Sequence, residues 1–222
     1  METKGRKIMI RKLALTLTMA ASLLMSGVSF AHEHEGGEKH EKHEKHEMAA
    51  PKVGEMAPAF TAKDINGETV SLADLKGKTV VLEWTNHECP FVMKHYETGN
   101  MQAAQEKAAE MGVTWISIVS SAKGNQGAVT AEEAKMIVEE KGAKAAHRIL
   151  DPKGEIGHMY AAKTTPHMFV IDAEGVPRYQ GAIDDNPSPR QSTVEGAKNY
   201  VLEALMALDA GEEIEVTESR PY

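Results

Sequence analysis

The hydrophobic pattern of the chain indicates an α/β domain. Near-continuous apolar runs at 78–84 and 113–119 are typical of strands buried in a central sheet. Weaker strand patterns lie at 70–72, 148–150, 167–171 and 178–183, and the last two, joined by a four-residue turn, predict an antiparallel pair. Helical spacing and helix-end residues predict helices over 90–111, 131–141, 156–161 and 194–208. This alternation predicts a central mixed β-sheet flanked by helices.

The beginning of the chain has a different pattern. A basic patch precedes an apolar run from Leu13 to Phe30, and the run ends in Ser-Phe-Ala at Ala31. Small residues at the last and third-last positions are typical of a secretory signal peptide, so we expect residues 1–31 to be removed by cleavage after Ala31. A retained membrane anchor is the alternative, but polar and small residues interrupt the run, and a spanning helix needs about 20 strongly apolar residues. We therefore expect a periplasmic or secreted protein that contacts a membrane only through an uncleaved signal segment.

A histidine-rich segment follows, over residues 32–50. It lacks a core-forming pattern and contains Glu-Lys-His three times in succession, so we expect a disordered linker. Imidazole is a common ligand of zinc, copper and nickel, and this density of histidines favours some metal affinity over a plain charged spacer. The candidate ligands are His32, His34, His40, His43 and His46.

The charge balance limits the classes of partner. The chain has 25 Lys and Arg against 33 Asp and Glu, a formal charge of −8. Without residues 1–31, which hold five basic residues and one acidic residue, 20 and 32 remain and the charge is −12. A surface this acidic excludes nucleic acid as an expected partner. The remaining sequence, 51–222, is long enough for one domain.

Cys89 is the single cysteine of the chain, so it cannot form an internal disulfide. It follows a predicted buried strand after a short loop and directly precedes Pro90, a residue favoured at the first position of a helix. A helix amino terminus offers unpaired N–H groups and the positive end of the helix dipole, which favour a reactive thiolate. The neighbouring residues 85–90 are too polar for a core, so a reactive role is favoured over a buried structural one.

Several segments resemble the redoxin (AhpC/TSA) branch of the thioredoxin superfamily. The sequence 54–60, followed by 64–67, 70–72 and 75–78, is similar to the amino-terminal signature of that branch. Residues 86–92, Asn-His-Glu-Cys-Pro-Phe-Val, resemble the active-site segment of its peroxiredoxin-like group, and 181–186 resemble a second motif of that group. Thr165-Pro166 is similar to the cis-proline site that faces the active cysteine. The resemblance covers about 52–210 and implies a thioredoxin-like fold.

The resemblance also implies a redox activity centred on Cys89. Peroxiredoxins carry Thr or Ser three residues before the cysteine and an Arg near it, whereas this chain has Asn86 and Pro166 at the matching positions. Thr85, Arg148 and Arg178 are the candidates to replace them. With one thiol, the chemically complete cycle is a peroxidase in which an external thiol or a thioredoxin-like protein reduces the oxidised cysteine. A protein disulfide is the alternative substrate, although exchange then stalls at the mixed disulfide. No cofactor is required.

Other polar residues near Cys89 are candidates for supporting roles. Glu83 resembles the buried proton-shuttle carboxylate beneath the thioredoxin active site, and a solvent-facing position at the strand end is the alternative. His87 and His95 are close enough in sequence to act on the thiol or to bind a metal with it.

Copper delivery is the alternative function. Sco-type copper chaperones place Cys-x-x-x-Cys-Pro and a distant histidine on this fold, and here Thr85 stands in the place of the first cysteine. The distant ligand would be His147, His158 or His167, but one sulfur instead of two weakens copper selection. Methionines at helical spacing, such as Met136 and Met206, are interpreted as packing residues rather than copper ligands.

Overall fold

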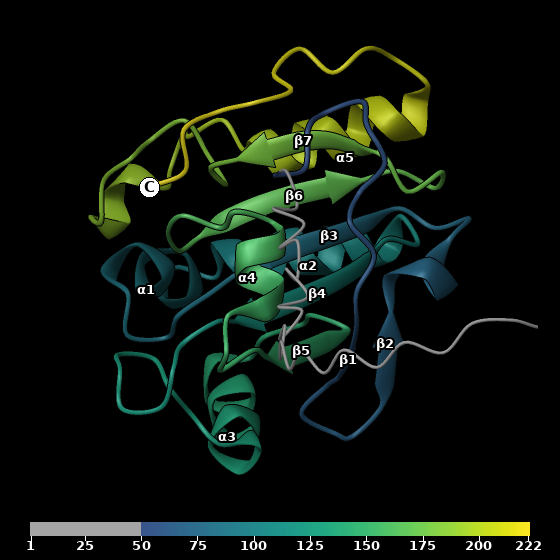
Figure 1. Ribbon diagram of the computed structural model, residues 1–222. Helices are drawn as coiled ribbons and strands as arrows, with labels where there is room; N and C mark the ends of the chain where they lie inside the picture. The colour runs from purple at the N-terminus through teal and green to yellow at the C-terminus, as the bar shows by residue number, and fades with distance from the viewer. Residues whose placement is uncertain (1–49) are drawn as a thin grey trace, which may run out of the picture. The chain divides into compact units, whose positions relative to one another are not determined.

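Five strands form one mixed sheet in the order β5-β4-β3-β6-β7, as Figure 1 shows. The computed structural model describes residues 50–222, so the predicted signal peptide and all but the end of the histidine-rich segment lie outside the described residues. The strands of the sheet are β3 (Val80–Trp84), β4 (Thr114–Val119), β5 (His147–Leu150), β6 (His167–Ile171) and β7 (Pro177–Gly181). The predicted mixed sheet is confirmed.

The central strand β3 sets the geometry of the sheet. It pairs in parallel with β4 and antiparallel with β6, and every one of its five residues is buried. In the antiparallel pair, Trp84 at the end of β3 lies opposite His167 at the start of β6. The chain therefore leaves β3 and enters β6 at the same end of the sheet.

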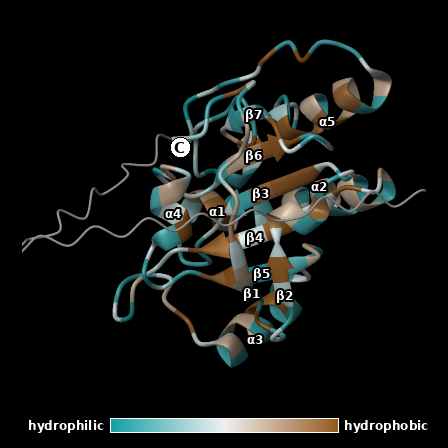
Figure 2. Cartoon of the chain, turned by 45° about the vertical axis from the view of Figure 1, so that its right-hand side comes forward, coloured by the Kyte–Doolittle hydropathy of each residue, from teal (hydrophilic) through white to brown (hydrophobic). Residues whose placement is uncertain are grey.

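Helices and a small hairpin cover the two faces. On one face the apolar core includes residues of α1 (Pro90–Glu97), α2 (Asn100–Glu110) and α5 (Tyr200–Ala210). The opposite face packs against α4 (Glu155–Met159) and the hairpin of β1 (Thr61–Lys63) and β2 (Thr69–Ser71). Figure 2 shows the strands of the sheet as largely hydrophobic, between helices that carry both kinds of residue. The remaining elements are α3 (Ala131–Lys141) and two 3-10 helices, Leu72–Leu75 and Gln191–Thr193.

Most predicted elements match, but two helices differ. The helix expected over 90–111 is two helices, because Gly99 adopts a left-handed conformation with φ of 77° and ends the first of them. The helix expected over 194–208 begins at Tyr200, where the side chain of Asn199 caps it. Strand β1 was not predicted.

The helices settle one further expectation. Met136 and Met206 are 61% and 50% exposed, so their interpretation as core residues is wrong. Helical spacing alone does not tell which helix faces are covered.

Within the described residues, no helix combines the length and the apolar character that a membrane crossing requires.

The cap of α5 supplies a test of the fold. The Asn199 side-chain oxygen accepts a hydrogen bond from the Leu202 amide at 3.0 Å. Asn199→Ala should lower the free energy of unfolding by about 1 kcal/mol, measured by urea denaturation, because the amide loses its partner. Asn199→Asp keeps an acceptor and is the matched control. Equal stability of the two variants would contradict the assignment of the cap.

Candidate functional site

Cys89 is the N-cap residue of α1, and Pro90 occupies the first helical turn. Its thiol is half-buried and packs at the edge of the core beneath α1, α2 and α5. The thiol therefore lies at the positive end of a helix dipole and next to unpaired backbone N–H groups. This arrangement matches the prediction from Pro90, and it suits a thiol that reacts as a thiolate.

The loop before β6 contacts the thiol. Cys89 Sγ lies 3.1 Å from the carbonyl oxygen of Thr165, to which it donates a hydrogen bond. The Thr165–Pro166 peptide bond is cis, and Pro166 is buried. The predicted cis-proline site thus faces the cysteine, although 76 residues separate Thr165 from it in the sequence.

The loop that carries Cys89 is fixed by a second loop, residues 120–130. The Asn86 side chain accepts a hydrogen bond from the Glu88 amide at 2.9 Å, and the Glu88 carboxylate accepts one from the Gly127 amide. Gly127 has φ of +79°, and a Cβ at this position would lie 2.3 Å from the Asn86 side-chain oxygen. Asn86 therefore holds the shape of the loop, and Gly127 leaves room for it.

Thr85 lies on the side of this loop that faces α4. Its side chain is buried, its amide donates to the Ile118 carbonyl at 2.9 Å, and it lines a cavity of about 320 Å³. The same cavity is lined by Thr165 and His158. Thr85 thus lies next to the loop that contacts the thiol, but it makes no side-chain hydrogen bond to Sγ.

Glu83 is fully buried, so the solvent-facing alternative is wrong. Its carboxylate accepts hydrogen bonds from Tyr96 Oη at 3.0 Å, from Gln105 Nε2 at 3.2 Å and from Trp115 Nε1 at 2.8 Å. These donors replace the water that a buried carboxylate loses. Burial and the charge of Glu83 raise the pKa of Tyr96, which keeps that hydroxyl protonated as a donor.

The two candidate arginines are engaged elsewhere. Arg148 Nε donates to the Ser117 hydroxyl at 3.2 Å, and Arg178 forms an ion pair with Asp172. In the described residues, the one hydrogen bond of Cys89 Sγ is that to Thr165, so neither arginine polarises a ligand at the thiol through direct contact with it. The structure shows no stand-in for the peroxide-polarising pair at Sγ.

Within residues 50–222, neither of the two nearby histidines hydrogen-bonds the thiol. His95 is buried and hydrogen-bonds Asn100 Nδ2 at 2.7 Å and Tyr222 Oη at 3.2 Å. Burial, reinforced by the charge of Lys94, lowers the pKa of His95 to about 3, so the imidazole is neutral at pH 7. His87 lines a small cleft with Tyr96 and Arg148.

A buried polar cluster beside α1 escaped the sequence analysis. Lys94 and Asp184 have fully buried side chains, with Nζ and Oδ2 3.6 Å apart. The Tyr222 hydroxyl donates to the Asp184 carboxylate and accepts a hydrogen bond from Lys94 Nζ at 3.3 Å. Burial lowers the pKa of Lys94, and Asp184 opposes that shift. The similarity of residues 181–186 to a family motif was the one sequence signal for this cluster.

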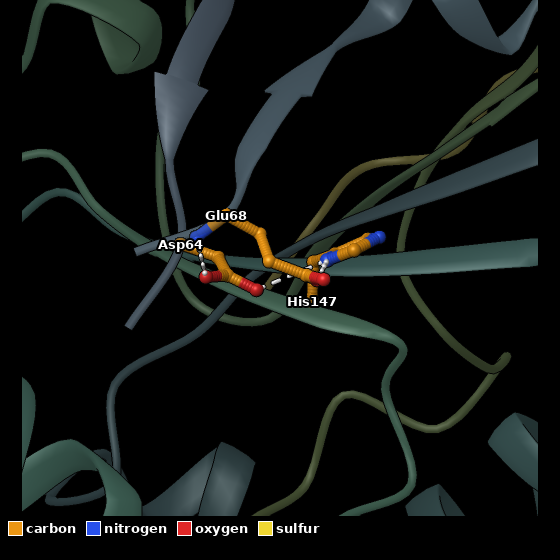
Figure 3. A group of neighbouring side chains, drawn as sticks. All are labelled: Asp64, Glu68 and His147. Atoms are coloured by element: carbon orange, nitrogen blue, oxygen red, sulfur yellow. Dashed lines mark hydrogen bonds and ion pairs between the residues drawn. The ribbon is translucent and has the colours of Figure 1, made fainter. Parts of the chain in front are cut away.

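Potential metal ligands gather at one place in the described residues, far along the sheet from β6. Asp64, Glu68 and His147 present ligand atoms within 4.8 Å of one another, as Figure 3 shows. His147 Nδ1 lies 3.1 Å from Asp64 Oδ2, and Asp64 also accepts from the amides of Asn66 and Glu68. Burial opposes ionisation of Asp64, but these hydrogen bonds hold its pKa below the usual range. The Asp64 carboxylate is thus engaged by the backbone of the turn over residues 64–68 and by His147.

The predicted copper ligands are not assembled around Cys89. His147 belongs to the cluster with Asp64, His158 lines the cavity beside Thr85, and His167 is buried against Phe169. Burial, aided by the charge of Lys163, lowers the pKa of His167 to about 4. The five histidines of residues 32–46 lie outside the described residues, and their metal affinity stays a prediction.

Comparison with known families decides the assignment of the fold. The family model for Redoxin matches residues 52–200, about two thirds of the chain. The chain belongs to the redoxin family. Membership confirms the predicted resemblance and supports a thioredoxin-like redox function for this redoxin. A comparison with curated proteins finds no significant match.

Solved structures show the same fold. An uncharacterised conserved protein from Geobacillus kaustophilus is 24% identical, with a TM-score of 0.63 over 77% of this chain and 87% of that one. A hypothetical protein from Sinorhizobium meliloti is 20% identical, with a TM-score of 0.64 over 78% and 94%. A candidate thiol:disulfide interchange protein, DsbE, from Chlorobium tepidum is 23% identical, with a TM-score of 0.52 over 70% and 99%. These similarities confirm the thioredoxin-like fold.

The buried histidine gives the redoxin a pH-dependent stability. His95 faces Lys94, Asn100, Asp184 and Tyr222, and its folded pKa of about 3 lies below the unfolded value of about 6.5. Between these values the unfolded chain binds the extra proton, so stability falls as the pH falls. From pH 7 to pH 5, His95 alone should remove about 2 kcal/mol from the free energy of unfolding.

The variant His95→Gln isolates this contribution. Glutamine keeps hydrogen-bonding groups towards Tyr222 and Asn100 but does not titrate, so the variant should lose about 2 kcal/mol less than the wild type over the same interval. Urea denaturation at both pH values measures the difference. His167→Gln should change the slope in the same direction, since the pKa of His167 is lowered to about 4. Equal slopes for wild type and His95→Gln would refute the neutral imidazole.

Proposed function

We propose that this redoxin is an exported, thiol-dependent peroxidase that acts through Cys89. The observation that carries the proposal is the position of the thiol, at the amino terminus of α1 and within 3.1 Å of the loop before β6. A half-buried thiol is accessible to a small oxidant, and helix starts are positions where reactive cysteines are found in proteins. Export is supported by the signal-peptide pattern of residues 1–31.

The first step consumes the peroxide. The Cys89 thiolate attacks the nearer oxygen of R–O–O–H, the O–O bond breaks, and the leaving alkoxide takes a proton to become R–OH. The sulfur is oxidised to a sulfenic acid while the peroxide is reduced. In the structure Sγ donates to the Thr165 carbonyl, so attack on the peroxide must give up that hydrogen bond.

Two external thiols complete the cycle. The first attacks the sulfenic sulfur, forms a mixed disulfide with Cys89 and releases the hydroxyl as water. A second thiol attacks that disulfide and restores the Cys89 thiol. The chain has no second cysteine, so both must come from an external reductant or a thioredoxin-like protein. Thiol–disulfide exchange on a protein disulfide, the alternative, uses the same sulfur and also needs an external second thiol.

Chemical trapping tests the proposal. Hydrogen peroxide followed by a sulfenic-acid trap such as dimedone should label Cys89 in the wild type, as intact and peptide mass spectrometry measure. Peroxide consumption with an external dithiol should fall to the protein-free background in Cys89→Ser, because no other cysteine is present. His95→Gln, which does not contact the thiol, is the matched control.

The result that would overturn the peroxidase is specific. If thiol titration confirms free Cys89 but peroxide yields no trapped sulfenic acid, the site does not react with peroxides. Formation of a mixed disulfide with a model protein disulfide under the same conditions would then favour thiol–disulfide exchange.

A further inference from the structure

Lys163 borders several cavities and belongs to the loop that contacts Cys89. It directly precedes Thr164 and Thr165, and the Thr165 carbonyl contacts Cys89 Sγ. Lys163 and Thr164 line the 320 Å³ cavity that is also lined by Thr85 and His158. They also line a cavity of about 610 Å³, whose other lining residues are Ser219, Arg220, Pro221 and Tyr222. We call these two spaces the Lys163 cavities.

No acidic side chain lines the Lys163 cavities. None of the residues that line either one is Asp or Glu, whereas residues 50–222 as a whole hold 26 Asp and Glu against 17 Lys and Arg. Lys163 and Arg220 are exposed, and in this part of the chain neither lies within 4.0 Å of a carboxylate. A third, smaller cavity that also includes Lys163 contains Glu218, which accepts a hydrogen bond from Gln180 Nε2 at 2.8 Å. Two unneutralised cations thus flank the loop at the thiol.

The wall that carries Arg220 is firmly attached. The chain from Thr217 to Ser219 runs beside β7, where the Gln180 amide donates to the Thr217 carbonyl at 3.0 Å and the Ser219 amide to the Gln180 carbonyl at 3.1 Å. Ser219 Oγ accepts from the Ala182 amide at 2.9 Å, and a Cβ on Gly181 would collide with that oxygen. Beyond Arg220, the Tyr222 ring packs on Phe91 and its hydroxyl reaches the buried Asp184. Arg220 is therefore held between two anchors.

We propose that the Lys163 cavities bind an acidic peptide segment that flanks the reducing cysteine of a partner protein. This inference rests on the proposed function, because the one-thiol cycle needs a second thiol from outside. Opposite charges at the thiol would raise the rate of encounter with such a partner, while the acidic remainder of the domain repels it elsewhere. An extended peptide can occupy both Lys163 cavities, whereas a small thiol needs only one of them.

Arg220 lies outside the matched redoxin region, which ends at residue 200. Selectivity for acidic segments would therefore be a property of this chain's own carboxy-terminal wall combined with a residue of the loop before β6.

A disulfide-exchange assay tests the proposal without using peroxide. Cys89 is first converted to its mixed disulfide with thionitrobenzoate, and a cysteine peptide is then added. The peptide thiolate attacks Cys89 Sγ, the new disulfide forms, and thionitrobenzoate leaves as a coloured thiolate. Because Cys89 is the single cysteine, each released chromophore reports one attack at this site.

Two peptides of equal length are compared, one with glutamates and one with glutamines around the cysteine. The glutamate peptide should react about fivefold faster at low ionic strength after correction for its thiolate fraction, the size expected of two exposed ion pairs, and added salt should remove the difference. In Lys163→Gln/Arg220→Gln the two peptides should react equally. Both side chains are exposed, so the variant should fold, as its thermal midpoint checks.

The control variant is Lys76→Gln/Lys78→Gln. It removes the same number of exposed charges before β3, at the opposite end of that strand from Cys89, and it should keep the fivefold preference. Equal rates for the two peptides on the wild type, or a preference that persists in Lys163→Gln/Arg220→Gln, would overturn the proposal. So would glutathione showing the same charge-dependent acceleration as the peptide, since the cavities would then select a small anionic thiol. Failure of the peroxide test alone leaves this exchange assay interpretable.

Discussion

The antiparallel register between β3 and β6 is the constraint on which the site depends. With Trp84 opposite His167, the loop after β3 and the loop before β6 emerge side by side at one end of the sheet. One loop carries Cys89 and the other carries Thr165, whose carbonyl contacts the thiol at 3.1 Å. A slip of one residue would turn every side chain of β3 to the opposite face and remove Glu83 from its donors. The apolar side chains on both faces of β3 make that slip costly.

The same register ties the thiol to the buried carboxylate. Leu82 and Trp84 belong to the core on the α4 face, whereas Glu83 points to the face that α1 and α2 cover. Tyr96, near the end of α1, donates to Glu83, while Cys89 at the start of α1 donates to Thr165. Helix α1 is thus fixed at both ends, once to the central strand and once to the loop before β6. Because Tyr96 fixes the far end, the dipole of α1 stays aligned on the thiol.

The parts of this architecture that local chemistry determines could be predicted. Buried apolar runs identify β3 and β4, and Pro90 marks the helix start that makes Cys89 a cap. Gly99 interrupts the helix that was expected over 90–111, although the apolar spacing continues through it. Hydrophobic spacing does not show that a glycine will adopt a left-handed conformation. Strand β1, Thr-Ala-Lys, has too few apolar residues to produce a strand signal.

The contacts that could not be predicted join distant parts of the chain. The Tyr222 hydroxyl donates a hydrogen bond to Asp184, 38 residues away in the sequence. No sequence pattern around either residue predicts this contact. Likewise, a carboxylate in an apolar strand could point to solvent or to the core, and only the positions of Tyr96, Gln105 and Trp115 explain how Glu83 is tolerated inside. Sequence comparison pointed to the Asp184 region, but without the physical reason for it.

In a protein with a single cysteine, selectivity for the reductant depends on the surface around that cysteine. A redoxin with two cysteines can resolve its own oxidised thiol, whereas in the cycle proposed for this chain the resolving sulfur comes from another molecule, so the choice of reductant would depend on what surrounds the thiol. On a domain with nine more acidic than basic residues, most of the surface repels an acidic partner. The Lys163 cavities carry the opposite sign next to the loop that contacts Cys89. Contrast in charge orients an approaching partner, so the proposed recognition depends on two exposed cations, Lys163 and Arg220, at the cavities next to the loop that contacts Cys89.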